Sequence, residues 1–175
     1  DTWHLSQCRR EIAEFEATWT PWARDSVAEQ RSKLTAILDK CPAVVIAGGH
    51  VAALLNRLEL FGMRELIANK TIIAWSAGAM AITERVVLYH DFPPQGFGAS
   101  EVLAWGLGAI PNVVALPQPE YRLNTEDQSC IRVMAQRFAP SQCIGLPART
   151  TVTYRNGNLE QPSGVMALRA DGTIE

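Results

Sequence analysis

The stretch Trp75-Ser76-Ala77-Gly78-Ala79 decides the interpretation of this chain. A short apolar run rich in isoleucine, residues 71–74, precedes it and predicts a buried strand, whereas the Ala- and Met-rich stretch that follows Ser76 predicts a helix. A serine at a sharp strand-to-helix turn, flanked by small residues, has the form of a nucleophile elbow with its hydroxyl at the positive end of the helix. Because Ala74 stands where the full Gly-x-Ser-x-Gly pattern has its first glycine, an ordinary helix cap by Ser76 is the alternative.

The composition is that of one globular domain with a sizeable core. The chain has 175 residues, of which 47% are hydrophobic and 19% charged, with a formal net charge of −2. This balance gives no electrostatic basis for binding nucleic acid or an anionic membrane, and no apolar run approaches the roughly 20 residues that span a bilayer. The four cysteines are widely spaced and form no Cys-x-x-Cys. We therefore expect a cytoplasmic protein with no metal and no cofactor.

The order of the predicted elements indicates an α/β fold. Residues 1–41 form a helical N-terminal segment, and residues 42–175 form an α/β domain in which strands alternate with helices. This alternation predicts a mostly parallel, doubly wound sheet flanked by helices, with a C-terminal β-hairpin that turns at Asn156-Gly157 between residues 150–154 and 164–168. The continuous apolar run of residues 43–47 predicts a strand covered on both faces. In such sheets, sites form beyond the carboxyl ends of the strands, where both Ser76 and Gly48-Gly49-His50 stand.

Several motifs in the same order resemble the dipeptidase E and cyanophycinase family of serine peptidases, which has a class I glutamine amidotransferase-like fold. The resemblance covers roughly residues 42–170. It rests on seven stretches: Val45 to His50, Ala74 to Ala79, His90-Asp91-Phe92-Pro93, Pro94-Gln95-Gly96-Phe97, Gly106 to Pro111, Ile144-Gly145-Leu146-Pro147, and Val152 to Gly157.

The resemblance implies roles for five residues. Ser76 falls on the nucleophile, and Gly48 and Gly49 fall on the glycine pair that lets backbone amides approach an oxyanion. The amide of Ala77 would be the second oxyanion donor, and such preorganised donors are a large catalytic term. Asp91 falls on an active-site aspartate of the family.

Two positions depart from the family. Gln118 or Glu120, depending on which proline aligns, stands where the family has its histidine base, and Ala148 stands where it has the acid. A serine hydroxyl without a base is a poor nucleophile near neutral pH. Two histidines, His50 and His90, could be relocated bases. Glu120 and Asp91 could act as carboxylate bases, although a carboxylate activates a serine weakly unless burial raises its pKa.

The sequence leaves three functions open. We favour a degenerate site that binds a small peptide or an acidic small molecule, or serves as a scaffold, with His50, Gln118 and Arg122 as ligand contacts and Arg149 as a further cation. The alternative is an active serine peptidase that cleaves small peptides with acidic residues and uses a relocated base. Glutamine amidotransfer ranks last because its elbow needs a cysteine.

The N-terminal region also departs from the family, which has a strand–helix–strand unit before the glycine pair. Here residues 1–40 predict only helices, so the chain is a fragment, another chain supplies the missing strands, or the helices replace them. The tryptophans of this region, Trp3, Trp19 and Trp22, pack the helices onto the domain or suit an interface with a second copy or a partner chain.

Overall fold

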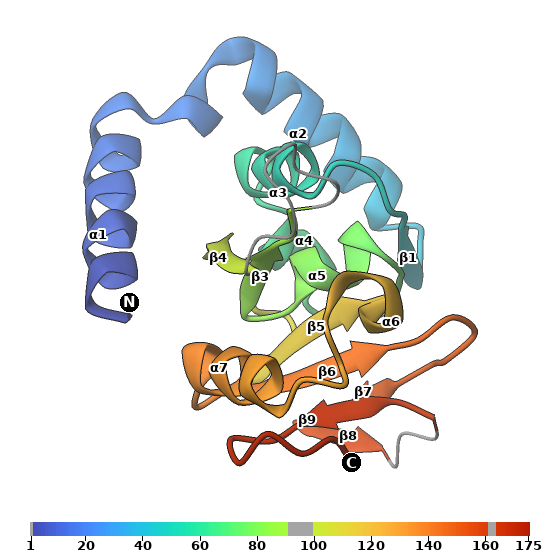
Figure 1. Cartoon of the computed structure of the whole chain (residues 1–175). Coiled ribbons are helices and arrows are strands. Elements are labelled where there is room, and N and C mark those ends of the chain that lie inside the picture. Colours follow the sequence, from blue (N-terminus) through green and yellow to red (C-terminus); the bar gives the residue numbers. More distant parts are fainter. Residues whose placement is uncertain (1, 91–99, 161–163) are drawn as a thin grey trace.

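The computed structural model describes residues 2–90, 100–160 and 164–175 (Figure 1). The helices are α1 (Thr2–Trp19), the 3-10 helix η1 (Pro21–Ala23), α2 (Asp25–Leu38), α3 (Val51–Leu60), α4 (Met63–Ile67), α5 (Ala77–Ile82), α6 (Pro119–Arg122) and α7 (Gln128–Phe138). The strands are β1 (Ala43–Ile46), β2 (Thr71–Ala74), β3 (Arg85–Leu88), β4 (Glu101–Trp105), β5 (Val113–Pro117), β6 (Gln142–Leu146), β7 (Thr153–Arg155), β8 (Asn158–Glu160) and β9 (Met166–Leu168).

The strands form small sheets, and the predicted doubly wound, mostly parallel sheet is wrong. In the described residues β1 and β2 form a parallel pair, and β3 and β4 an antiparallel pair. A third sheet pairs β5 in parallel with β6, and β9 joins β6 from the other side in antiparallel orientation. The two parallel pairs are therefore separate units, and the fold is mixed α/β.

The β1–β2 pair shows why the single sheet does not form. Val45 and Ile73 are register partners, yet they are 58% and 53% exposed, so the strands are covered on one face only. The Thr71 amide donates to the Pro42 carbonyl, and the Trp75 amide donates to the Ile46 carbonyl of β1. Because successive residues of a strand point their backbone amides to opposite edges, the amides of Ile72 and Ala74 point to the other edge of β2. No strand pairs with that edge in the part of the chain that the structure describes.

The C-terminal hairpin turns where the sequence predicts it, but its second arm is different. Asn156 and Gly157 have positive φ angles of 51° and 84°, and the turn joins β7 to β8. Residues 158–160 supply the second arm, and not residues 164–168. Strand β9 pairs with β6 instead, because its residues complete the β5–β6–β9 sheet against α7.

The hydrophobic core lies between α5, β3, β5, β6 and α7. Every residue of α5 is buried, and Phe138, Leu116 and Val86 are fully enclosed. The buried Arg85 guanidinium donates to the carbonyls of Phe138 and Ala139 and to the Ser141 hydroxyl, so β3 is tied to the turn between α7 and β6. This core fixes α5, and with it the Ser76 turn.

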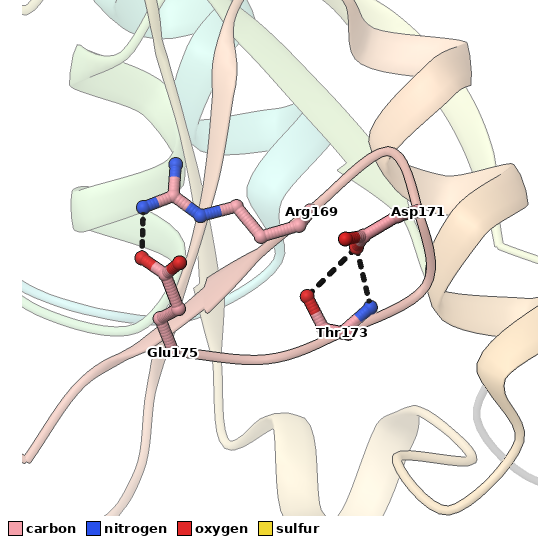
Figure 2. Close-up of polar contacts among 4 residues, drawn as sticks. All are labelled: Arg169, Asp171, Thr173 and Glu175. Carbon is pink, nitrogen blue, oxygen red and sulfur yellow. Dashed lines mark hydrogen bonds and ion pairs between the residues drawn. The ribbon is translucent and has the colours of Figure 1, made fainter.

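The chain end folds back on β9 (Figure 2). Ala167 and Glu175 exchange backbone hydrogen bonds, and Arg169 forms an ion pair with the Glu175 carboxylate. In the turn between them the Asp171 carboxylate accepts from the Thr173 hydroxyl at 2.7 Å and from its amide at 2.9 Å. These two bonds lower the pKa of Asp171. The Gly172 amide donates to the Arg169 carbonyl at 3.0 Å, so residues 169–172 form the turn that brings Glu175 back to β9.

The N-terminal region is helical, as predicted. Helix α2 packs beside α4, and its Leu38 belongs to the core. Helix α1 is different, because none of residues 3–19 is buried. Figure 1 shows it in dark blue at one side of the molecule, reached through η1 and α2. Among the described residues, no helix combines the length and the apolar character needed to cross a membrane.

Candidate functional site

Ser76 forms a strained turn between β2 and α5. Its φ and ψ angles are 52° and −124°, outside the regions that residues other than glycine normally adopt. The turn is held on both sides, because Trp75 donates to the Ile46 carbonyl at 3.3 Å and Gly78 donates to the Trp75 carbonyl at 3.0 Å. Such strain costs about 1–3 kcal/mol and persists only where the surroundings fix it. The local geometry is that of an elbow rather than an ordinary helix cap, and Ser76 caps α5 with no side-chain hydrogen bond.

Two glycines allow the elbow to pack against the end of β1. A Cβ on Gly48 would stand 2.9 Å from the Ser76 Cβ and 3.1 Å from its hydroxyl oxygen. A Cβ on Gly78 would stand 2.2 Å from the Ile46 carbonyl oxygen. The structure thus brings Gly48, Ser76 and the buried Ala77 together, as the sequence predicts.

A cavity of about 1200 Å³ opens beside Ser76. Consecutive residues of β2 form one wall, and β5, β6 and the β7–β8 hairpin form the others. Much of the lining is aliphatic, including Ile72, Ile82, Ile144 and Leu146. Apolar walls with a few placed polar groups are typical of small-molecule sites.

The charged side chains that line this cavity are all cations. They are Arg64, Lys70, Arg149 and Arg155, and no aspartate or glutamate is among the described lining residues. Lys70 donates to the carbonyls of Leu38 and Cys41, and Arg155 pairs with Glu160 at 3.1 Å. Arg64 and Arg149 have no hydrogen-bond or ion-pair partner in the part of the chain that the structure describes. Two guanidinium groups therefore remain available to an anion in the cavity.

The histidines do not supply a base to Ser76. The Nδ1 atom of His50 accepts the Ala53 amide at 3.3 Å, so His50 caps α3. His90 lies 3.5 Å from the Glu101 carboxylate, and His4 lies in α1, 3.7 Å from the Cys8 sulfur. None of the three lines the cavity. Across residues 2–90, 100–160 and 164–175 the Ser76 hydroxyl has no hydrogen-bond partner.

The remaining candidate residues divide into three groups. Gln118 lines the cavity at the carboxyl end of β5, where it adopts a left-handed conformation with φ 54°. His50, Gly49 and Arg122 do not line it. The Arg122 guanidinium lies 4.9 Å over the Tyr89 ring, whereas Gly49 is exposed, with φ 141° and no heavy atom within 4 Å of a Cβ built on it. Asp91 lies outside the described residues.

Glu120 and Ala148, two positions at which the sequence departs from the family that it resembles, lie side by side. The Glu120 carboxylate accepts the backbone amide of Ala148 at 3.2 Å. This contact joins the start of α6 to the loop after β6, because Pro117 and Leu146 are register partners at the ends of β5 and β6. The bond occupies one oxygen of the Glu120 carboxylate.

Sequence reasoning missed Arg64, Lys70 and Arg155 as lining residues. They come from α4, the start of β2 and the β7–β8 hairpin, and only the tertiary fold brings them to one cavity. No local pattern distinguishes these cations from solvated surface residues. In the described residues no group of three His, Cys, Asp or Glu side chains could hold a metal ion.

Comparison with known proteins does not assign the chain. No family model matches it, and a search of curated proteins finds no match.

Proposed function

We propose that the protein is a non-catalytic binding protein that holds a small carboxylate-bearing ligand, such as a short acidic peptide, in the cavity beside Ser76. The observation that carries the proposal is the charge of the cavity: its described lining contains four cations and no carboxylate. A cavity of one sign in a low-dielectric wall concentrates ligands of the opposite sign.

Arg149 is the first candidate for the ligand contact. It follows β6, lines the cavity and has no partner among the described residues. A guanidinium presents paired N–H groups that match a carboxylate, and charge-assisted bonds of this kind are about twice as strong as neutral ones. Arg64, equally without a described partner, could hold a second acidic group.

The surroundings of Ser76 support binding without chemistry. A serine becomes a nucleophile when an adjacent base takes its proton, and no described imidazole serves this purpose. Gln118 cannot accept a proton, and Ala148 cannot orient a base. We infer a degenerate relative of the dipeptidase E and cyanophycinase family that keeps the elbow and the pocket.

The second candidate function is an active serine peptidase for small acidic peptides. The strained conformation of Ser76 favours it, because residues held in rare backbone conformations cluster at active sites. A base within the residues outside the described ranges, such as Asp91, would be needed to activate the hydroxyl.

Isothermal titration calorimetry tests the proposed function. Aspartyl-leucine should bind, whereas asparaginyl-leucinamide, which lacks both carboxylates, should bind at least tenfold more weakly. The Arg149→Gln variant should weaken binding of aspartyl-leucine about tenfold or more, since a hydrogen bond to a charged group contributes roughly 1.5–3 kcal/mol. Arg24→Gln, an exposed arginine outside the cavity, is the matched control and should bind normally. Equal binding of the two dipeptides, or no binding at millimolar concentration, would overturn the proposal.

A further inference from the structure

Helix α1 carries an apolar stripe with the spacing of a coiled-coil seam. Its members are three and four residues apart in strict alternation: Leu5, Cys8, Ile12, Phe15 and Trp19. In heptad notation they occupy alternating a and d positions over about two and a half heptads. A spacing of this kind places every member on one narrow face of the helix.

The part of this stripe from Ile12 to Trp19 is exposed in the single chain, whereas Leu5 and Cys8 are half-buried. Ile12, Phe15 and Trp19 are 58%, 59% and 58% exposed. Large apolar side chains gathered on one face, rather than scattered singly, mark an interaction surface. The partly exposed aromatic pair Phe15 and Trp19, with ring centroids 6.2 Å apart, already forms a continuous patch.

One flank of the helix lies against the domain and leaves the stripe exposed from Ile12 to Trp19. The Arg9 guanidinium lies 5.0 Å over the Trp105 ring of β4. Glu16, one heptad later on the same flank, lies close enough to Glu59 of α3 to raise its pKa, an effect second to that of burial. The contact of Arg9 with Trp105 therefore holds this flank of the helix to the domain, and Ile12, Phe15 and Trp19 stay exposed beside it.

We propose that the α1 stripe pairs with the α1 stripe of a second copy of this chain in antiparallel orientation. Antiparallel pairing places Ile12 against Phe15 of the second copy at the centre, and the small Cys8 against the large Trp19 at each end. Such layers of unequal side chains fill a helix interface well.

The flanking charges select the antiparallel orientation. In a parallel pair, the residue at a g position of one helix faces the residue at the next e position of the other helix. This arrangement would place Glu11 opposite Glu16 of the second copy, and His4 opposite Arg9. In an antiparallel pair, the equivalent flanks of the two helices face each other. Arg9 of each copy then lies opposite Glu16 of the other copy, so this pair of opposite charges occurs twice. The face of the Arg9 guanidinium covers Trp105, but its edge still carries N–H donors for this carboxylate.

The dimer is expected to be weak. Helix α1 has 18 residues, which is about 27 Å of helix, and the interface falls at the small end of specific contacts. We therefore expect a dissociation constant in the micromolar range. Because α1 does not line the ligand cavity, the dimer and the proposed function are tested by separate experiments.

Sedimentation velocity from 1 to 200 μM tests the existence of the dimer. The parent chain should shift from monomer to dimer across this range, and Ile12→Glu and Phe15→Glu should stay monomeric with an unchanged far-UV circular dichroism spectrum. Ala17→Glu, an exposed position off the stripe on the same helix, should dimerise like the parent. A parent that is monomeric at 200 μM, or a dimer that survives both stripe variants, overturns the proposal.

Disulfide trapping tests the orientation. In Trp19→Cys, mild oxidation should join Cys8 of one copy to the cysteine introduced at position 19 of the other, identified by peptide mass spectrometry. The two positions lie eleven residues apart on one helix, about 16 Å, which is too far for a disulfide within a chain. A Cys8–Cys8 bond in the parent protein would instead show parallel pairing and contradict the proposal.

Discussion

Gly48 lies directly against Ser76, so that a Cβ at position 48 would stand 2.9 Å from the serine Cβ. This contact joins the residue that follows β1 to the turn that follows β2. Because the φ angle of Gly48 is not positive, the need for glycine here is steric and not conformational.

The first prediction concerns this contact. Gly48→Ala should lower the free energy of unfolding by about 1–3 kcal/mol, the usual cost of an overpacked contact. Urea unfolding measures it. Combining Gly48→Ala with Ser76→Gly removes the opposing Cβ and should recover most of the loss, whereas simple additivity of the two changes would contradict the contact.

The second prediction concerns the strain at Ser76. A glycine adopts φ 52° and ψ −124° without penalty, so Ser76→Gly should be about 1 kcal/mol more stable than Ser76→Ala, after the entropy cost of glycine is subtracted. Thermal or urea unfolding gives the difference. Ser32, an exposed residue inside α2, is the control, and there the glycine variant should be the less stable one. The same order at both positions would mean that Ser76 is not strained.

The third prediction is a pH dependence of stability. Burial raises the pKa of the Cys143 thiol to about 12, whereas an unfolded thiol ionises near about 8.5. The thiol contributes its full stability below pH 8, and this is lost as the pH rises toward 12, because the unfolded chain then releases a proton that the folded chain keeps. Between pH 8 and 10 the loss should be about 2 kcal/mol.

Urea unfolding at pH 8 and pH 10 measures this change. Cys143→Ala should be less stable at both values because it leaves a cavity, but its loss between them should be about 2 kcal/mol smaller than in the parent. An equal pH dependence in both proteins would show that Cys143 titrates normally.

The fourth prediction compares two glycines with positive φ angles. Gly172 (φ 95°) and Gly157 (φ 84°) both lie in turns, but a Cβ on Gly172 would stand 2.5 Å from the Gln128 carbonyl oxygen, whereas a Cβ on Gly157 meets nothing within 4 Å. Gly172→Ala should therefore cost about 1–3 kcal/mol more than Gly157→Ala. Equal unfolding free energies of the two variants would mean that the C-terminal turn drawn in Figure 2 does not rest on the start of α7.

The sequence predicts the local elements better than their assembly. The strand before Ser76, the helix after it and the helical N-terminal region all lie where the patterns place them. The apolar run at residues 43–47 predicts a strand covered on both faces, but Val45 is exposed beside Ile73. An apolar pattern reports the tendency of a strand to be buried, and it does not specify which strand or helix will cover it.

The candidate site also shows this difference between local features, which the sequence predicts, and tertiary arrangement, which it does not. The turn at Ser76 and the small residues around it are local features, so the sequence identifies them. Arg64 and Lys70 reach the cavity only because α4 and β2 pack beside it, and no spacing in the sequence records that arrangement. Gln118 and Ala148 can be seen in the sequence at the positions where the resemblance implies a histidine and an acid, but the use of His50 as the cap of α3 requires the structure.

Labelling with a fluorophosphonate probe tests most directly whether Ser76 stands in a binding site without a base to activate it. The parent protein and Ser76→Ala are compared by mass spectrometry after incubation near pH 7.5, with an active serine hydrolase as the control for the probe. If the site is non-catalytic, the parent protein should gain no adduct beyond that of Ser76→Ala. A stoichiometric adduct on Ser76, absent from Ser76→Ala, would contradict it and establish an activated serine.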